Sequence, residues 1–291
     1  MPVGQVIRSH SNIHYVLVDG QEIECRPRGK FRLDKLQVLT GDLVEIHMEG
    51  DEGRIDKLLP RRNALERPSV ANVDQAVLIF TLKEPEADYP FLDRVLVHIE
   101  QVGVEVLILL NKVDLLDQEA VDRFLRTYRE QVGYPALAIS AREGLGVDAI
   151  RPYLAGKTSV LAGHSGVGKS RLIRTLEPGR EDIKVGALSE KRGRGKHTTR
   201  HVELIPLTGG GLVADAPGFT YLEFQEIDKW TLRDYFPEFR QRLGQCRFDD
   251  CLHRKEPDCA VRAAVEAGEI AASRYENYLT FLAEVEASKR W

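Results

Sequence analysis

The chain has 291 residues, of which 43% are hydrophobic and 30% charged, and its net charge is −4. These values are typical of soluble globular proteins, and the length suits about two domains. No apolar run approaches the roughly 18 residues of a membrane span, and the first residues lack the apolar core of a signal peptide. We therefore expect a cytoplasmic, monomeric protein and exclude membrane proteins, small disulfide-rich secreted domains and disordered chains.

The first 68 residues have the pattern of short β-strands separated by turns. This spacing predicts a small five-stranded barrel over residues 1–68, and an oligonucleotide-binding (OB) barrel is the leading candidate. A proline-containing stretch near residue 60 resembles a linker that leaves the barrel. The strands are expected over residues 4–8, 14–18, 22–25 and 42–47.

A basic segment follows the third of these strands, with the sequence RPRGKFR. If it continues the strand, period two places all its charges on one face, which suits contact with RNA phosphates. A solvated edge strand that uses charge against aggregation explains the same pattern. The candidate RNA-binding residues are Arg26, Arg28, Lys30 and Arg32.

From about residue 74, apolar strands alternate with amphipathic helices, and this pattern predicts a mostly parallel α/β sheet over residues 69–222. In such sheets ligands bind at the carboxyl ends of the strands. Residues 223–291 then have a helical pattern interrupted by a Cys/His cluster. Strands are expected over 76–82, 104–110, 136–139, 159–162 and 212–214, and helices over 90–102, 118–131 and 169–176.

The strongest motif is GHSGVGKS, which matches the phosphate-loop pattern between an expected strand and an expected helix. Its glycines let backbone N–H groups close around phosphates at a helix N-terminus. Lys169 is then expected to reach the β- and γ-phosphates as a catalytic group, and Ser170 to ligate magnesium. The expected phosphate-binding residues are Gly163, His164, Ser165, Gly166, Val167, Gly168, Lys169 and Ser170.

Two further motifs, NKVD at 111–114 and Ser-Ala at 140–141, follow expected strands and predict recognition of guanine. Asp114 can accept hydrogen bonds from the guanine N1–H and exocyclic amine, and the Ala141 amide is expected to meet O6. Asn111 and Lys112 are expected to buttress the base and the phosphate loop. Val113, between Lys112 and Asp114, and Ser140, beside Ala141, complete the two motifs. A lone NKxD is a weak signal, because Asn and Asp are common after strands.

A third motif, DAPG, supplies Asp215 for magnesium through a water and the Gly218 amide as a sensor of the γ-phosphate. The order of all these motifs is that of a circularly permuted GTPase. The guanine motifs usually follow the phosphate loop, whereas here they precede it. The permutation moves the chain ends, so that the barrel enters before the base-binding half and the C-terminal region follows DAPG directly.

The segment between phosphate loop and DAPG is basic, and it contains Thr198 and Thr199, of which either is a candidate magnesium ligand in switch I. The basic side chains suit contact with RNA phosphates, and a charge-solvated loop explains them equally. Position 219 is Phe, where many small GTPases carry a water-orienting glutamine, so we expect slow intrinsic hydrolysis. His197 and His164 are candidates to compensate, although His197 also suits RNA contact. The candidate RNA-binding residues here are Lys191, Arg192, Arg194, Lys196 and Arg200.

Cys246, Cys251, His253 and Cys259 have the spacing C-x4-C-x-H-x5-C near the C-terminus. Three thiolates and one imidazole make a complete tetrahedral zinc set with no open position. In a chain without a secretory signal, the cluster favours a structural zinc over disulfides, and chance clustering of buried thiols is the alternative. Cys25 stands apart and is expected to be buried in the barrel core.

Taken together, these motifs resemble the RsgA/YjeQ family of circularly permuted GTPases over essentially the whole chain. The resemblance rests on the order NKVD, SA, GHSGVGKS, GRGKHTTR, DAPGF, on the preceding barrel and on CRFDDCLHRKEPDC after it. It implies an OB barrel, a permuted GTPase domain and a zinc domain, with GTP, Mg²⁺ and Zn²⁺ bound. It also implies that the small (30S) ribosomal subunit and its 16S rRNA are the partners, and that the subunit stimulates hydrolysis late in assembly.

A mechanical hypothesis follows from the chain order, in which loss of the γ-phosphate moves the zinc domain through switch II and releases the subunit. Two alternatives stay open at this point. One is an assembly GTPase for another ribonucleoprotein, and the other is an RNA-binding scaffold whose GTP site only regulates affinity.

Overall fold

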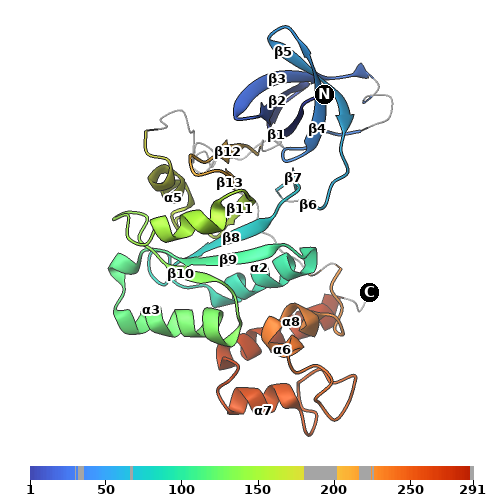
Figure 1. Ribbon diagram of the computed structural model, residues 1–291. Coiled ribbons are helices and arrows are strands. Elements are labelled where there is room, and N and C mark those ends of the chain that lie inside the picture. The colour runs from blue at the N-terminus through green and yellow to red at the C-terminus, as the bar shows by residue number, and fades with distance from the viewer. Residues whose placement is uncertain are drawn as a thin grey trace, which may run out of the picture. The chain divides into compact units, whose positions relative to one another are not determined.

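The computed structural model describes residues 1–29, 31, 36–65, 68–179, 202–215, 224 and 226–288 (Figure 1). The chain divides into two compact units. We call residues 1–77 with 147–219 the barrel unit, and residues 78–146 with 220–291 the C-terminal unit. Among the described residues, no helix has the length and apolarity needed to cross a membrane.

Five strands of the barrel unit close into a barrel in the order β1-β2-β3-β5-β4. In the described part of the barrel, β3 and β5 pair in parallel. The pairs β1–β2, β1–β4, β2–β3 and β4–β5 are antiparallel. This is an OB barrel, as the turn spacing predicts. Inward-facing residues alternate along the strands, and Cys25 is fully buried among them, as expected. The strands are β1 (Val3–His10), β2 (Ile13–Val18), β3 (Gln21–Pro27), β4 (Leu43–Glu49) and β5 (Glu52–Leu58).

The basic segment after β3 does not continue the strand. β3 ends at Pro27, and the chain then turns, with the Phe31 N–H donating to the Arg28 carbonyl. The described strand therefore contains only Arg26 of the four charged residues, and the period-two placement of the others on one face stays a prediction. Arg28 lies just after the strand, while Lys30 and Arg32 lie outside the described residues.

The central sheet has six strands in the order β10-β9-β8-β11-β13-β12. Strand β10 pairs in parallel with β9, and β11 pairs in parallel with β13, whereas β12 pairs antiparallel with β13. Strands β8 and β11 are buried along their whole length, as strands covered on both faces must be. The strands are β8 (Gln75–Phe80), β9 (Glu105–Leu110), β10 (Ala136–Ala138), β11 (Thr158–Ala162), β12 (Leu204–Pro206) and β13 (Leu212–Asp215).

Local sequence signals set the limits of the helices beside this sheet. Helix α2 (Tyr89–Val102) is capped by Asp88, whose carboxylate accepts the Phe91 N–H at 3.0 Å, and Gly103 ends it in a left-handed conformation. The helix expected over 118–131 is α3 (Gln118–Leu125) followed by a π-helical turn, Arg126–Gln131. The remaining short elements are β6 (Ala64–Leu65), β7 (Val70–Ala71), η1 (Val113–Leu115), η3 (Asp148–Ile150), α4 (Arg151–Leu154) and α5 (Lys169–Leu176).

The C-terminal region is helical and has its own aromatic core. Phe236, Phe239 and Tyr278 are fully buried there, with ring centroids about 5 Å apart. Along the last helix, Tyr278 and Leu282 are fully buried in this core. The elements are η4 (Leu232–Tyr235), α6 (Pro237–Arg240), α7 (Ala260–Glu266) and α8 (Ala272–Ser288), coloured orange to red in Figure 1.

Within the barrel unit, uncharged side chains and an exposed ion pair, Arg8 with Glu203 at 3.5 Å, join the barrel to the sheet. The Thr40 hydroxyl donates to the Val202 carbonyl at 3.0 Å, directly before β12. Gln5 of β1 donates to the Thr158 hydroxyl at 3.1 Å, at the start of β11. A charged pair stands at the edge of this junction, where Arg61 donates to buried Asp42 at 2.6 and 2.8 Å while keeping 30% of its own side chain exposed.

Within the C-terminal unit, a buried ionic network joins α8 to α2 and α6. Arg274 donates to Asp93 at 2.7 Å and to both Glu238 oxygens at 2.8 and 3.1 Å, and all three side chains are about 1% exposed. Asn277 and Tyr128 complete the shell of Asp93, at 2.6 and 3.0 Å. Burial lowers the pKa of Arg274, but the two carboxylates outweigh it and hold that pKa well above its usual value.

Candidate nucleotide and metal sites

The phosphate-loop motif forms a tight turn between β11 and α5 in the barrel unit. Gly163, Gly166 and Gly168 all have positive φ, of 137°, 85° and 103°, which favours glycine at these positions. The Lys169 ammonium lies over the loop and donates to the carbonyls of Gly163 and His164 at 2.8 and 2.9 Å. The loop therefore has a cation beside a helix N-terminus, an arrangement suited to phosphate.

Asp215 reaches the same edge of the sheet from a distant part of the sequence. β13 pairs in parallel with β11, and Asp215 is level with Leu161, two residues before the phosphate loop begins. The fold thus supplies the backbone placement that a magnesium-binding Asp needs. The remaining predicted residues of this region lie outside the described part of the chain, namely Lys191, Arg192, Arg194, Lys196, His197, Thr198, Thr199, Arg200, Gly218 and Phe219.

The guanine motifs lie in the C-terminal unit, at the ends of β9 and β10. Asn111 is buried, and its side-chain oxygen accepts the Ala141 N–H at 2.9 Å, so this residue ties the two loops together. Lys112 has a positive φ of 63° and donates to the Glu84 carbonyl. Asp114 is exposed in η1, beside Val113, while Ser140 is buried and its hydroxyl accepts the Glu143 N–H at 3.2 Å. The buttress role of Asn111 fits this geometry, and the contact of the Ala141 amide with guanine stays a prediction.

The structure brings together all four predicted metal ligands in the C-terminal unit. The ligand atoms of Cys246, Cys251, His253 and Cys259 lie within 4.8 Å of one another. The Cys246 and Cys259 sulfurs are 4.0 Å apart, and His253 Nδ1 is 3.6 and 3.4 Å from them. Tetrahedral zinc with ordinary bond lengths requires sulfur–sulfur and sulfur–nitrogen separations of about 3.8 and 3.6 Å. The donor set and its spacing therefore fit zinc.

The ionisation of these ligands also fits a cation. Burial raises the pKa of Cys251 to about 12 and raises that of Cys259, so the protein alone keeps these thiols protonated at neutral pH. Coordination of a metal ion supplies the charge that stabilises thiolates in such a place. Burial likewise lowers the pKa of His253 to about 4, which keeps the imidazole neutral and its lone pair available.

Side chains from outside the cluster hold the loop that carries the ligands. The Glu256 carboxylate accepts the N–H groups of Leu252 and Arg254 at 2.9 and 2.7 Å. From α8, the hydroxyl of Tyr275 donates to the His253 carbonyl at 2.7 Å. Sequence reasoning missed these groups, because no motif connects Glu256 or Tyr275 to the four ligands. The cluster is therefore pre-organised by hydrogen bonds to its backbone.

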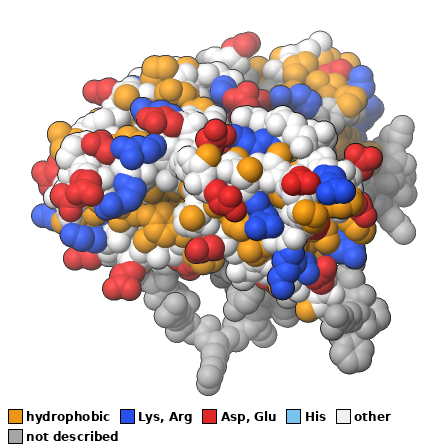
Figure 2. Space-filling view, turned by 90° about the horizontal axis from the view of Figure 1, so that it is seen from below, with side chains coloured by type: hydrophobic (Ala, Val, Ile, Leu, Met, Phe, Trp, Pro, Cys, Tyr) orange, Lys and Arg blue, Asp and Glu red, His pale blue; other side chains and the backbone are white. Residues whose placement is uncertain are grey.

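The basic side chains expected to contact RNA from the barrel have acidic neighbours. Arg26 and Arg28 keep 59% and 55% of their side chains exposed, but lie 3.8 Å from Glu24 and 3.4 Å from Asp56. Figure 2 shows the same mixture over the face that it displays, where Lys and Arg are interspersed with Asp and Glu. RNA contact by these two arginines stays a prediction.

Comparison with known proteins decides the family. The model of the RsgA GTPase family matches residues 58–225, and that of the RsgA N-terminal domain matches residues 3–55. The chain belongs to the RsgA GTPase family. Family membership, the closed barrel and the permuted motif order together establish a circularly permuted GTPase domain behind an OB barrel.

The similarity to individual RsgA proteins extends over the whole chain. A "Small ribosomal subunit biogenesis GTPase RsgA" from Shouchella clausii is 45% identical over 294 residues, covering 100% of this chain and 99% of the relative. A protein of the same name from Moorella thermoacetica is 47% identical and covers 99% of this chain and 98% of the relative.

Solved structures of the family are similar throughout. The crystal structure of YjeQ from Thermotoga maritima has a TM-score of 0.83 at 39% identity and covers 98% of each chain. The structure of YloQ, titled a circularly permuted GTPase, has a TM-score of 0.82 at 37% identity and covers 100% of this chain and 97% of that one. This chain is therefore a GTP hydrolase of the RsgA family with the same fold.

Proposed function

We propose that this protein hydrolyses GTP during late maturation of the small ribosomal subunit, and that hydrolysis promotes its release from the subunit. The observation that carries the proposal is the full-length similarity to proteins named for small-subunit biogenesis, together with the phosphate loop and the guanine motifs. Small-subunit assembly also suits the cytoplasmic location expected from the sequence. We further propose that the protein acts as a monomer and contacts 16S rRNA.

Each motif has its own role in GTP binding. In the C-terminal unit, Asp114 recognises the guanine edge, with Asn111 and Lys112 as its support. In the barrel unit, the loop 163–170 binds the phosphates through its backbone N–H groups. Lys169 carries the charge that stabilises the β- and γ-phosphates as the leaving group departs. In the described geometry its ammonium is already held over the loop by two carbonyls.

The Mg²⁺ that accompanies GTP would be held by Ser170 and, through water, by Asp215, with Thr198 or Thr199 as the switch I ligand. When bound, it neutralises charge that develops on the phosphate oxygens. Gly218 senses the γ-phosphate. With Phe at position 219, this chain lacks the usual water-orienting glutamine, and we propose that the subunit, with His197 as a candidate, completes the catalytic arrangement.

The accessory regions then serve attachment to the subunit. We assign residues 1–68 to an RNA-binding OB domain, residues 69–222 to the GTPase domain and residues 223–291 to a zinc domain. Zinc would be held by Cys246, Cys251, His253 and Cys259 as a structural ion that fixes the C-terminal loops. The basic residues of the barrel and of switch I would supply phosphate contacts that position the protein without reading sequence.

Steady-state GTP hydrolysis tests the function, measured alone, with small subunits, and with large subunits as the control. Strong stimulation by small subunits alone is the expected result. Equal stimulation by both subunits would favour an assembly role elsewhere, and no stimulation would favour a scaffold whose GTP site regulates affinity. Equal affinity for small subunits with GDP and with a non-hydrolysable GTP analogue would contradict the release step.

A further inference from the structure

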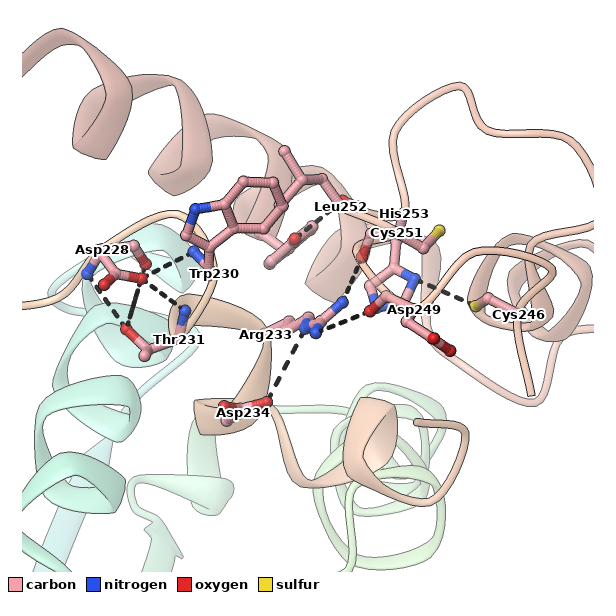
Figure 3. A network of polar contacts seen from close by, with 11 residues as sticks. Asp228, Trp230, Thr231, Arg233, Asp234, Cys246, Asp249, Cys251, Leu252 and His253 are labelled. Atoms are coloured by element: carbon pink, nitrogen blue, oxygen red, sulfur yellow. Dashed lines mark hydrogen bonds and ion pairs between the residues drawn. The ribbon is translucent and has the colours of Figure 1, made fainter. Parts of the chain in front are cut away.

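An arginine from a different element holds the loop that carries three of the candidate metal ligands. Arg233, in η4, donates through Nη1 to the Cys251 carbonyl at 2.7 Å and through Nη2 to the Asp249 carbonyl at 3.2 Å. Both carbonyls belong to the segment that connects Cys246 to His253 (Figure 3). One planar guanidinium therefore fixes two points of the backbone between three metal ligands.

The start of η4 is itself fixed, which gives the arginine a defined position. The Asp228 carboxylate accepts the N–H groups of Trp230 and Thr231, both at 2.8 Å, and the Thr231 hydroxyl also lies 3.1 Å from it. This turn precedes Arg233 by two residues and is visible beside it in Figure 3. Arg233 therefore follows a turn that the Asp228 carboxylate holds in place, as a supporting residue requires.

The charge of Arg233 has little local compensation. Its side chain is 19% exposed. In the described part of the chain, its nearest ion-pair partner is Asp234, with a carboxylate oxygen 4.0 Å from Nε. Among the residues that the structure describes, its buried Nε has no hydrogen-bond partner. A cation in such a place is costly unless a negative charge lies nearby. Zn²⁺ with three thiolates and a neutral imidazole has a net charge of −1, which complements the guanidinium.

We propose that Arg233 is a positioning residue of the metal centre, which holds the Cys251–Asp249 backbone and compensates the negative charge of the zinc–thiolate group. The inference rests on the proposed zinc site and goes beyond it, since it assigns a role to a residue outside the four ligands. Groups of this kind set metal affinity because they orient the ligands and balance their charge.

The chain offers a matched control in Arg242. Its side chain is 18% exposed, and it too donates to a backbone carbonyl, that of Glu238 at 3.1 Å. It forms an ion pair with Glu269 at 2.6 Å. Neither of these two contacts involves the segment 246–259 that carries the four ligands. If the loss of any mostly buried arginine of the C-terminal unit weakened zinc binding, R242M would therefore show the same loss of zinc affinity as R233M.

Zinc affinity tests the proposal, measured by competition with a chromophoric chelator in full-length wild type, R233M, R233K and R242M. We expect R233M to bind zinc about 10- to 100-fold more weakly, R233K to fall between R233M and wild type, and R242M to stay close to wild type. The Co²⁺ absorption spectrum at saturating metal should keep its tetrahedral thiolate signature in all four proteins. If R233M folds only with excess zinc, the midpoint of metal-dependent refolding gives the same affinity.

Equal zinc affinity of R233M and R242M would overturn the proposal. R233K binding as weakly as R233M would overturn the charge-compensation part, since lysine keeps the charge but lacks the planar fork. Wild type that binds no stoichiometric zinc would instead overturn the proposed metal site itself, so the two failures are distinguishable.

Discussion

The two accessory regions are attached by opposite kinds of junction. The barrel is joined through uncharged groups such as Thr40 and Gln5 and through an exposed pair of Arg8 with Glu203. The C-terminal helices are joined through Arg274, which is buried with two carboxylates. Neutral hydrogen bonds cost little to bury and contribute little each, whereas a buried ion network is costly to assemble and is strongly destabilising when one partner is lost.

The two regions also differ in their candidate metal ligands. The four clustered ligands lie in a C-terminal loop with little regular structure, whereas the described part of the barrel has no such cluster and closes through strand pairing and its own apolar core. We therefore expect the two regions to respond differently to four perturbations.

Zinc removal should have the largest effect. Apparent binding energies of structural zinc are about 10–16 kcal/mol in small zinc domains, so chelation should abolish hydrogen-exchange protection in residues 246–259 and weaken it in α7. Protection of the barrel strands should not change. As matched variants, C251A should lose stoichiometric zinc, whereas C25A, at the buried cysteine of the barrel, should retain it. Retained protection of 246–259 after complete metal removal would contradict a structural role.

Loss of the buried arginine should come next. R274M leaves Asp93 and Glu238 buried without their cation, and we expect the free energy of unfolding of the C-terminal unit to fall by about 3–5 kcal/mol. Urea denaturation measures this. The control R247M removes an exposed pair with Asp258, worth at most about 1 kcal/mol. A fall in R274M no larger than that in R247M would show that the network contributes little.

A glycine at the barrel junction gives a smaller effect. Gly41 has φ of +92°, and an added Cβ would lie 2.0 Å from the Ala71 carbonyl oxygen, so the backbone must shift in G41A. We expect a loss of about 1–3 kcal/mol, measured by urea denaturation. Gly20 has a similar φ of +82° with nothing near the added Cβ, so G20A isolates the cost of the backbone conformation. If G41A and G20A destabilise equally, the close approach at the junction has no energetic consequence.

The pH response of the barrel should be the smallest effect. Burial lowers the pKa of His14, with the Asp42 charge opposing it, so the unfolded chain binds a proton at this residue more readily than the folded one. The barrel should therefore lose stability as pH falls below about 6.5, the ordinary pKa of histidine. Urea midpoints followed through barrel peptides by hydrogen exchange measure this. H14Q should flatten the dependence, and an unchanged slope in H14Q would assign the proton uptake elsewhere.

Most of the site was predictable from sequence because its parts are short and local. A phosphate loop, NKVD and the Cys/His spacing each depend on backbone turns that a few adjacent residues specify. Where the local signal was ambiguous, as in RPRGKFR, the sequence left two interpretations open, and the strand before it ends at Pro27. Asn111 contacts Ala141, 30 positions away, and Tyr275 contacts His253, 22 positions away. No local sequence pattern predicts contacts over such distances along the chain.

The sequence by itself determined the barrel, the permuted order of motifs and the four candidate metal ligands, because each follows from periodicity or from spacing along the chain. Only the tertiary structure showed which groups Arg274 and Arg233 contact. Arg274 is the single arginine of α8, and its partners lie 36 and 181 residues away. A buried charge is tolerated only where the fold brings its counter-charges together.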